Sequence, residues 1–198
     1  MRYSKEHKAE THRRVVEAAA RRFRKEGIEG TGVADLMADC GLTHGGFYAH
    51  FPSKESLVRE ALMAASGHGQ AHLRRQIDDA RAEHQDPLER VVRHYLTALH
   101  RDRPDRGCCV AALGAEIARH PRKTREAFTA GLERTLDVIA AALPDPSHPQ
   151  ARETAYAIFS IMIGALQLSR LLADPKLSQN ALDSGIKAAL RLASSQAS

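Results

Sequence analysis

Residues 26–62 read EGIEGTGVADLMADCGLTHGGFYAHFPSKESLVREAL, and this stretch decides the fold. Residues 33–39 place three apolar side chains on one face of a short helix, which ends at a turn containing Gly41. Residues 43–49 fit a second short helix, with Thr43 in position to cap it. Two short helices joined by a tight turn are typical of a helix-turn-helix, whose second helix enters the major groove of DNA.

The second short helix has an unusual composition for a helix. Gly45 and Gly46 are adjacent, and each costs about 1 kcal/mol of helix propensity relative to alanine. A reason for that cost is close approach, because glycine lets backbone amides and the positive helix end lie against a DNA phosphate. The same helix carries polar side chains that could reach DNA, and Phe47 and Phe51 are expected in the core.

The paired motifs in this stretch resemble the N-terminal domain of TetR-type transcription regulators. They are Thr31-Gly32-Val33, Cys40-Gly41-Leu42-Thr43, Gly46-Phe47-Tyr48-Ala49-His50-Phe51 and Ser53-Lys54-Glu55-Ser56-Leu57. The resemblance implies that one set of residues lies at or near DNA, with Arg2 and Lys5 reaching the adjacent groove. That set is Thr31, Thr43, His44, Gly45, Tyr48, His50 and Lys54.

Two positions depart from the family pattern, and two contacts stay open. Gly32 stands where the family often has Ser or Thr, so the usual side-chain cap is absent, and Cys40 replaces a common alanine. His50 could equally pack against Phe51, and Thr43 could be only a cap. Phosphate contacts position a protein on DNA, whereas only a few residues specify the sequence.

The rest of the chain predicts an all-α protein. Ala, Leu, Arg and Glu recur at helical spacing, and no stretch shows sustained β-branched or aromatic alternation. We expect about nine helices, over residues 4–26, 33–39, 43–49, 54–82, 86–101, 108–119, 121–143, 150–173 and 178–193, the fourth interrupted or bent around Gly67 and Gly69. The expected domains are 1–53 for DNA binding and 54–198 for ligand binding and dimerisation.

Charge and composition fit a cytoplasmic DNA-binding protein. The net charge is +5, and residues 1–25 alone hold nine Lys and Arg against three Asp and Glu. Such a cluster of positive charge is typical of a phosphate-binding surface, although a solvent-exposed amphipathic helix would have the same composition. An odd number of cysteines, no apolar leader at the N-terminus and a polar-interrupted run at residues 155–172 predict a reduced cytoplasmic protein without a membrane span.

The C-terminal helices are expected to sense a ligand and to dimerise. The resemblance implies a homodimeric repressor that binds palindromic double-stranded operator DNA and is released by a small-molecule inducer. The helix over residues 150–173 is apolar on nearly every face, so one face is expected to meet a partner. A stripe on the last helix is expected to complete the intersubunit bundle: Leu182, Ile186, Ala189, Leu190 and Ala193.

Candidate ligand-cavity residues combine apolar surface with a few polar anchors. They are Tyr95, Leu99, Phe128, Tyr156, Phe159, Met162 and Gln167. Residues of these types at helical spacing more often fill a core than bind a ligand, so that alternative stays open.

Cys108 and Cys109 begin the predicted helix at 108–119 and raise the possibility of thiol sensing. A helix N-terminus and neighbouring cations such as Arg106 lower the pKa of a thiol and raise its reactivity. The Gly-Cys element and the later Ala115-Glu116 pair also resemble a TetR subgroup in which some members respond to electrophiles or oxidants. The alternative is that both cysteines are small buried apolar residues.

The sequence offers little support for an enzyme or a metalloprotein. It lacks a Gly-x-Ser-x-Gly elbow, a Walker phosphate loop and a dinucleotide-binding glycine motif. His68 and His72 have the i, i+4 spacing of two ligands on one helix face, but no Cys, Asp or Glu set accompanies them. We therefore expect no catalysis, no metal and no cofactor, with a helical interaction protein as the other alternative to a DNA-binding regulator.

Overall fold

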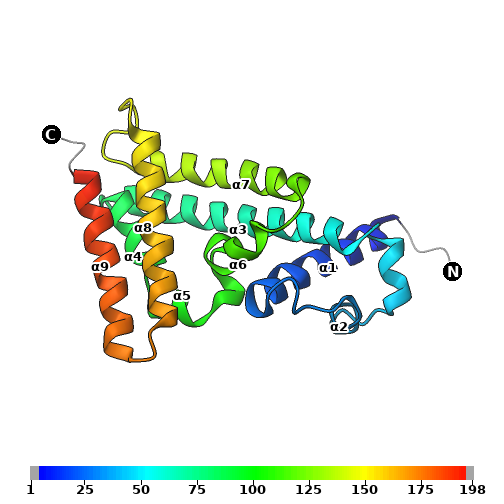
Figure 1. Cartoon of the computed structure of the whole chain (residues 1–198). Helices are drawn as coiled ribbons and strands as arrows, with labels where there is room; N and C mark the ends of the chain where they lie inside the picture. The colour runs from blue at the N-terminus through cyan, green and yellow to red at the C-terminus, as the bar shows by residue number, and fades with distance from the viewer. Residues whose placement is uncertain (1–4, 195–198) are drawn as a thin grey trace. The chain divides into compact units, whose positions relative to one another are not determined.

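The computed structural model describes residues 5–194, and this part of the chain is helical throughout, with no strand (Figure 1). The all-α prediction is confirmed. Its described elements are α1 (Lys5–Glu26), α2 (Val33–Asp39), the 3-10 helix η1 (His44–Ala49), α3 (Lys54–Ala82), α4 (Pro87–Tyr95), α5 (Ala98–Asp102), the 3-10 helix η2 (Pro104–Arg106), α6 (Cys109–Ile117), α7 (Arg122–Ala140), α8 (Ala151–Leu171) and α9 (Pro175–Ser194).

Packing divides the chain into two compact units. The first comprises the described part of Met1–Gly67 together with Cys108–Gly131, and the second comprises His68–Gly107 with the described part of Leu132–Ser198. The helices α3 and α7 therefore each contribute to both units. The functional boundary expected after residue 53 is a different kind of division and stays a prediction.

The first unit is built on a core that α6 shares with α1 and the helix-turn-helix. Val15, Ala19 and Phe23 of α1 are buried, as are Leu36 and Met37 of α2. The same cluster includes buried Phe47, Phe51, Leu57, Cys109, Leu113, Ile117 and Phe128. Burial of Phe47 and Phe51 confirms that these rings serve the core, where their centroids lie 5.4 Å apart.

The second unit is organised around α8 and α9, which run antiparallel to each other (Figure 1). Ile158, Met162 and Leu166 of α8 are fully buried, and so are Leu182 and Ala189 of α9, which packs against α8 in the same unit. Gly185 lets α9 approach α8 closely, because a Cβ atom there would lie 2.4 Å from the Cβ of Ala165. The stripe of α9 that the sequence assigned to a partner is therefore largely used inside the chain.

Three element predictions need correction. The expected helix over residues 86–101 is two helices, because Leu96 leaves helical geometry and the Thr97 hydroxyl accepts from the His100 amide at 3.2 Å to cap α5. The last helix begins at Pro175 rather than 178, since Asp174 caps it by accepting from the amides of residues 176 and 177. The expected interruption around residues 67–69 is also absent, because α3 runs unbroken to Ala82, whereas a bend there stays a prediction.

One described helix, α8, is long and apolar enough to cross a membrane by length and composition. Of its most apolar window, 39% is buried inside the chain. A core helix of a globular protein meets the same test, so this observation alone is weak evidence for a membrane span.

Candidate DNA-binding site

The 3-10 helix η1 and its N-cap residue together present a group of exposed residues. Thr43 is its N-cap, and the Thr43 hydroxyl accepts a hydrogen bond of 3.3 Å from the amide of Gly46. Thr43, His44 and Gly45 are exposed, and the side chain of Tyr48 is 67% exposed. The His44 and Tyr48 rings lie 6.3 Å apart between centroids. The structure thus brings four of the predicted DNA contacts together on one short element.

The two glycines of η1 differ in their surroundings. A Cβ atom at Gly45 would meet no described atom within 4 Å, whereas one at Gly46 would lie 3.5 Å from the Thr43 hydroxyl oxygen. The space around both Gly45 and Gly46 is therefore large enough for a Cβ atom. Packing within the described chain therefore gives no reason for glycine at either position, and close approach by an external partner stays a prediction.

His50 lies at the C-terminal end of η1 and is half-buried. Its Nδ1 atom is buried without a hydrogen-bond partner among the described residues. Burial lowers the pKa of His50, and the nearby His12 and Lys8 lower it further. The ring lies 6.3 Å from that of Phe51 between centroids. These effects favour the neutral form of the His50 ring, and its role at DNA stays a prediction.

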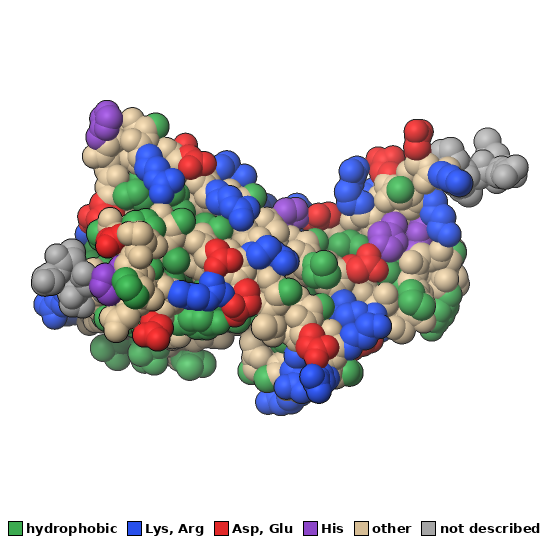
Figure 2. Space-filling view, turned by 90° about the horizontal axis from the view of Figure 1, so that it is seen from above, with side chains coloured by type: hydrophobic (Ala, Val, Ile, Leu, Met, Phe, Trp, Pro, Cys, Tyr) green, Lys and Arg blue, Asp and Glu red, His purple; other side chains and the backbone are tan. Residues whose placement is uncertain are grey.

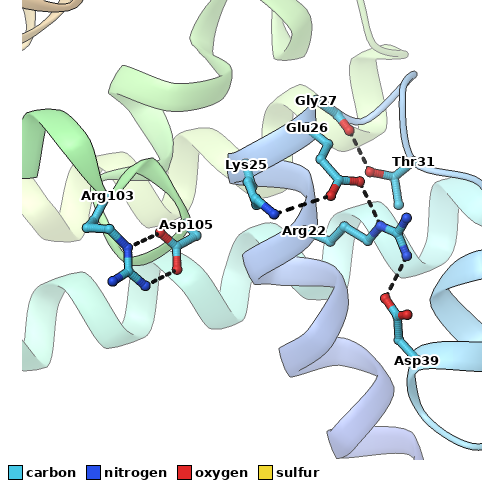
Figure 3. A network of polar contacts seen from close by, with 8 residues as sticks. All are labelled: Arg22, Lys25, Glu26, Gly27, Thr31, Asp39, Arg103 and Asp105. Carbon is cyan, nitrogen blue, oxygen red and sulfur yellow. Dashed lines mark hydrogen bonds and ion pairs between the residues drawn. The ribbon is translucent and has the colours of Figure 1, made fainter.

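Thr31 is buried in the turn between α1 and α2, with an exposed fraction of 1%. Its hydroxyl donates to the Gly27 carbonyl at 2.7 Å (Figure 3). Arg22 joins the same helices by donating to Glu26 at 2.7 Å and to Asp39 at 2.6 Å (Figure 3). The Thr31 side chain is thus engaged within the chain rather than displayed beside η1.

The remaining predicted contacts lie on other elements. Lys54 begins α3 and is half-buried, and the hydroxyl of the preceding Ser53 accepts from the Ser56 amide at 3.1 Å. Lys5 is exposed at the first residue of α1, and Arg2 lies outside the described residues. The predicted roles of these residues at DNA remain untested.

Two residues of α1, His12 and Arg14, contact the region of η1 in ways that the sequence did not predict. Arg14 donates to the Cys40 carbonyl in the turn at 2.8 Å, and the His12 ring stacks on Phe51 with centroids 4.3 Å apart. The Nε2 atom of His12 also pairs with Glu60 at 2.5 Å. His12 and Arg14 are two residues apart on α1 and so point to different faces of the helix, and local spacing does not reveal which loop or helix each one meets.

The two adjacent cysteines differ in environment. Cys108 is half-buried at the N-cap of α6, whereas Cys109 is buried and lies 3.5 Å from the Ser66 hydroxyl through its sulfur. Burial raises the pKa of Cys109 to about 12, against the weaker opposing effects of Ser66 and Arg24. Activation by the helix N-terminus is thus outweighed at Cys109, and Cys108 is the candidate for thiol sensing that remains.

The predicted cavity residues are distributed between the two units. Phe128 belongs to the core of the first unit, whereas Tyr95 and Phe159 are buried in the second with ring centroids 6.2 Å apart. In the second unit Gln167 is half-buried, and Tyr156 is exposed and donates its hydroxyl to Glu133. Of the two further candidates, Met162 is fully buried and Leu99 is 73% exposed.

Histidines gather in the second unit without forming a metal site. The His72 ring lies 4.7 Å from that of His94, and His68 is exposed. Across residues 5–194, no group of three or more His, Cys, Asp and Glu side chains is placed to hold a metal ion.

The chain matches two family models. "Bacterial regulatory proteins, tetR family" matches residues 15–61, and "Tetracyclin repressor-like, C-terminal domain" matches residues 85–184, which is just over half of the chain. The first match contains α2, η1 and the start of α3, and it therefore includes the exposed group of η1.

Individual relatives are similar over part or most of their length. The regulator TtgR from Pseudomonas putida is 40% identical over 62 residues, which is 31% of this chain and only 30% of TtgR. LmrA from Bacillus subtilis is 25% identical over 166 residues, covering 81% of this chain and 86% of LmrA. Both are HTH-type transcriptional regulators.

Solved structures share the fold. Reduced NemR from E. coli has a TM-score of 0.73 at 18% identity, covering 89% of this chain and 95% of NemR. AibR, solved with isovaleryl coenzyme A and operator DNA, has a TM-score of 0.57 at 20% identity, covering 89% of this chain and 96% of AibR. Proteins of this kind are helix-turn-helix regulators and not enzymes. On the family matches, this chain belongs to the TetR family of bacterial transcriptional regulators.

Proposed function

We propose that the chain is a ligand-responsive repressor that binds a palindromic operator as a homodimer and is released by a small molecule or by thiol modification. DNA binding is assigned to residues 1–53, and ligand binding and dimerisation to residues 54–198. The observation that carries the proposal is the exposed group Thr43, His44, Gly45 and Tyr48 on η1.

These side chains have the chemistry for reading DNA. A Thr hydroxyl and a His ring can bond to base edges, and a Tyr hydroxyl can bond to a phosphate oxygen. Lys54 adds a cation at the first turn of α3, where free backbone amides also favour an anion. AibR, a protein of the same fold, has been solved bound to its operator DNA.

The homodimer is supported by an uncharged stripe on α8. Ala157, Ser160, Gly164, Leu168 and Leu171 follow one another at intervals of three or four residues, and all five are exposed in the single chain. Such intervals keep a stripe on one helix face. The small residues at one end permit a close approach of another helix, and the two leucines at the other end supply apolar area.

Part of α9 continues this surface. A groove between the two helices is lined by Leu168 and Leu172 of the α8 end and by Leu177, Ala181 and Gly185 of α9. The exposed fractions of Leu168, Leu171 and Leu177 are 51%, 80% and 53%. Figure 2 shows hydrophobic side chains gathered at its lower left, on the side of the view where α8 and α9 of the second unit lie. A second copy related by a two-fold axis would cover this surface with its own α8 and α9.

The effector is assigned to the second unit or to Cys108. Tyr95 and Phe159 provide aromatic surface there, and Gln167, also on α8, provides a polar group in the same unit. AibR was solved with the acyl thioester isovaleryl coenzyme A, which shows that a protein of this fold can hold a small organic ligand. Cys108 is the accessible thiol of the adjacent pair. A regulator of this family acts on chromosomal DNA, so we place it in the cytoplasm.

The DNA-binding part is tested by titrating mixed-sequence duplex DNA at several salt concentrations. Affinity should fall steeply with salt, because each neutralised phosphate releases counterions and adds about 0.9 to the slope of log affinity against log salt. Lys54→Gln should weaken binding and reduce that slope by about one. Lys176→Gln, which removes an exposed cation of α9, is the matched control and should change neither. Equal behaviour of the two variants would contradict the placement of DNA at η1 and α3.

A further inference from the structure

The carboxylate of Glu116, in the last turn of α6, lies against the turn between α1 and α2. Its Oε2 atom accepts a hydrogen bond of 2.7 Å from the Ile28 amide and one of 3.4 Å from the Glu29 amide. Gly27, just before them, has a left-handed φ of +84°. A left-handed residue after a helical one turns successive amides towards a common point, and such concave backbone sites bind anions. Glu116 occupies such a site from within the same compact unit.

The fit of the carboxylate depends on glycine at position 27. A Cβ atom there would lie 2.9 Å from the Oε1 atom of Glu116, which is closer than real Cβ contacts. The left-handed φ would also strain any other common residue. Position 27 is thus suited both to the turn and to the approach of Glu116.

The turn passes directly into α2. The Thr31 hydroxyl donates to the Gly27 carbonyl at 2.7 Å, and the Thr31 amide donates to the Ile28 carbonyl at 3.3 Å. Gly32 follows as the N-cap of α2 and has no side chain with which to cap it. Thr31 therefore holds the turn that leads into α2, and α2 has no side-chain cap of its own.

The 3-10 helix η1 packs against α2. The Leu42 amide donates to the Met37 carbonyl at 2.9 Å, and a Cβ atom at Gly46 would touch the Met37 methyl at 3.9 Å. Any change in the direction of α2 would be passed on to η1. A chain of contacts thus runs from Glu116 through the turn and α2 to the exposed group of η1.

We propose that Glu116 is a positioning residue for operator binding: its carboxylate fixes the α1–α2 turn and thereby the direction in which α2 presents η1 to DNA. The inference rests on the proposed DNA-binding function. Glu116 lies in the region that the C-terminal family model matches, residues 85–184. It nevertheless packs in the same compact unit as the helix-turn-helix. Glu116 is half-buried, so its replacement leaves no large cavity.

The test compares Glu116→Gln with Glu126→Gln. Glu126 is exposed on α7 of the same unit and pairs with Arg122, so both variants lose one negative charge and gain the same general attraction to DNA. Affinity is measured for an operator obtained by selection with the wild type and for a scrambled duplex of equal length. Hydrogen exchange of the Ile28 and Glu29 amides is measured without DNA.

Glu116→Gln should bind the operator about tenfold more weakly than Glu126→Gln, because an amide oxygen accepts more weakly than a carboxylate. Its affinity for the scrambled duplex should equal that of the control, and its thermal midpoint should stay within about 3 °C of it. Exchange at Ile28 and Glu29 should be at least about fivefold faster. A loss of affinity on both duplexes alike would indicate a merely structural role and overturn the proposal.

Equal operator affinity in the two variants would also overturn it. If the wild type binds no duplex DNA, the proposed function fails, and the exchange measurement still decides whether Glu116 holds the turn. Unchanged exchange at Ile28 and Glu29 would then contradict the positioning role independently of DNA binding.

Discussion

Gly185 of α9 lies so close to Ala165 of α8 that a Cβ atom at position 185 would come within 2.4 Å of the Ala165 Cβ atom. The same Cβ would lie 3.1 Å from a methyl group of Leu96. Gly185→Ala should therefore force α8 and α9 apart and lower the free energy of unfolding by about 1–3 kcal/mol, as overpacking in a core does. Chemical denaturation followed by circular dichroism measures this change.

The matched control is Gly114→Ala in α6. A Cβ atom at Gly114 would meet no described atom within 4 Å, so alanine should raise the free energy of unfolding by up to about 1 kcal/mol through helix propensity. A Gly185→Ala protein as stable as the wild type would show that the two helices can separate without cost.

The proposed dimer surface gives a second prediction. Leu168→Glu places a charge in the leucine end of the uncharged stripe of α8, and a buried unpaired carboxylate at an interface is costly. We expect a monomer by sedimentation at concentrations where the wild type is a dimer, with unchanged helical content. Ala82→Glu, at an exposed position of α3, is the control and should stay dimeric. A Leu168→Glu dimer of wild-type stability would exclude this surface as the interface.

Stability should depend on pH through His100. Its Nδ1–H donates to the Tyr95 carbonyl at 2.7 Å, and burial lowers the pKa of His100 from 6.5 to about 4, helped by Arg170, His94 and His72. The unfolded chain binds this proton at higher pH than the folded chain does, so the contribution is present above about pH 6.5 and is lost as the pH falls towards 4. The loss amounts to roughly 2–3 kcal/mol.

Denaturation of the wild type and of His100→Gln at pH 7 and pH 4.5 measures this contribution. The variant retains a donor for the Tyr95 carbonyl but does not titrate, so its stability should change less between the two pH values. His68→Gln, at an exposed position of α3, should behave like the wild type. Identical pH dependence in all three proteins would contradict the assignment to His100.

The element boundaries near the helix-turn-helix follow from the sequence, whereas the arrangement of α6 does not. Helix α2 spans the predicted residues 33–39, because a local apolar face and a following Gly41 mark it out. The packing of Cys109, Leu113 and Ile117 against α1 depends on residues some 90 positions apart, and no local pattern encodes it. The sequence therefore marks Glu116 only as part of the Ala115-Glu116 pair, without its contact to the α1–α2 turn.

The other corrected elements, the break between α4 and α5 and the start of α9, each have their own cause. Thr97 caps α5 after Leu96 is drawn into the core, and Arg170 holds the end of α5 by donating to the His100 carbonyl at 2.9 Å. Asp174 and Pro175 stop one helix and start another, and local chemistry fits both. The apolar stripe of α9 could be covered either by α8 of the same chain or by a partner, so the sequence alone could not assign Leu182 to the chain's own core.

Reactivity should separate the two adjacent cysteines. With a pKa of about 12, Cys109 holds about a thousandfold less thiolate at neutral pH than a thiol at the ordinary value of 9.0. Iodoacetamide should therefore label the half-buried Cys108 first, and Cys109 and the buried Cys40 only on unfolding. Mass spectrometry of peptides sampled over time gives the three rates. Labelling of Cys109 as fast as Cys108 would contradict the burial argument.

The central claim is that a dimer of this chain reads a specific duplex through η1. Its most direct measurement is repeated selection from a random duplex library by the reduced wild-type protein, followed by sequencing. The account predicts an inverted repeat whose half-sites are one helical turn of about 34–36 Å, or a multiple of it, apart. Absence of any enriched sequence, from a protein shown to be a folded dimer, would contradict the claim.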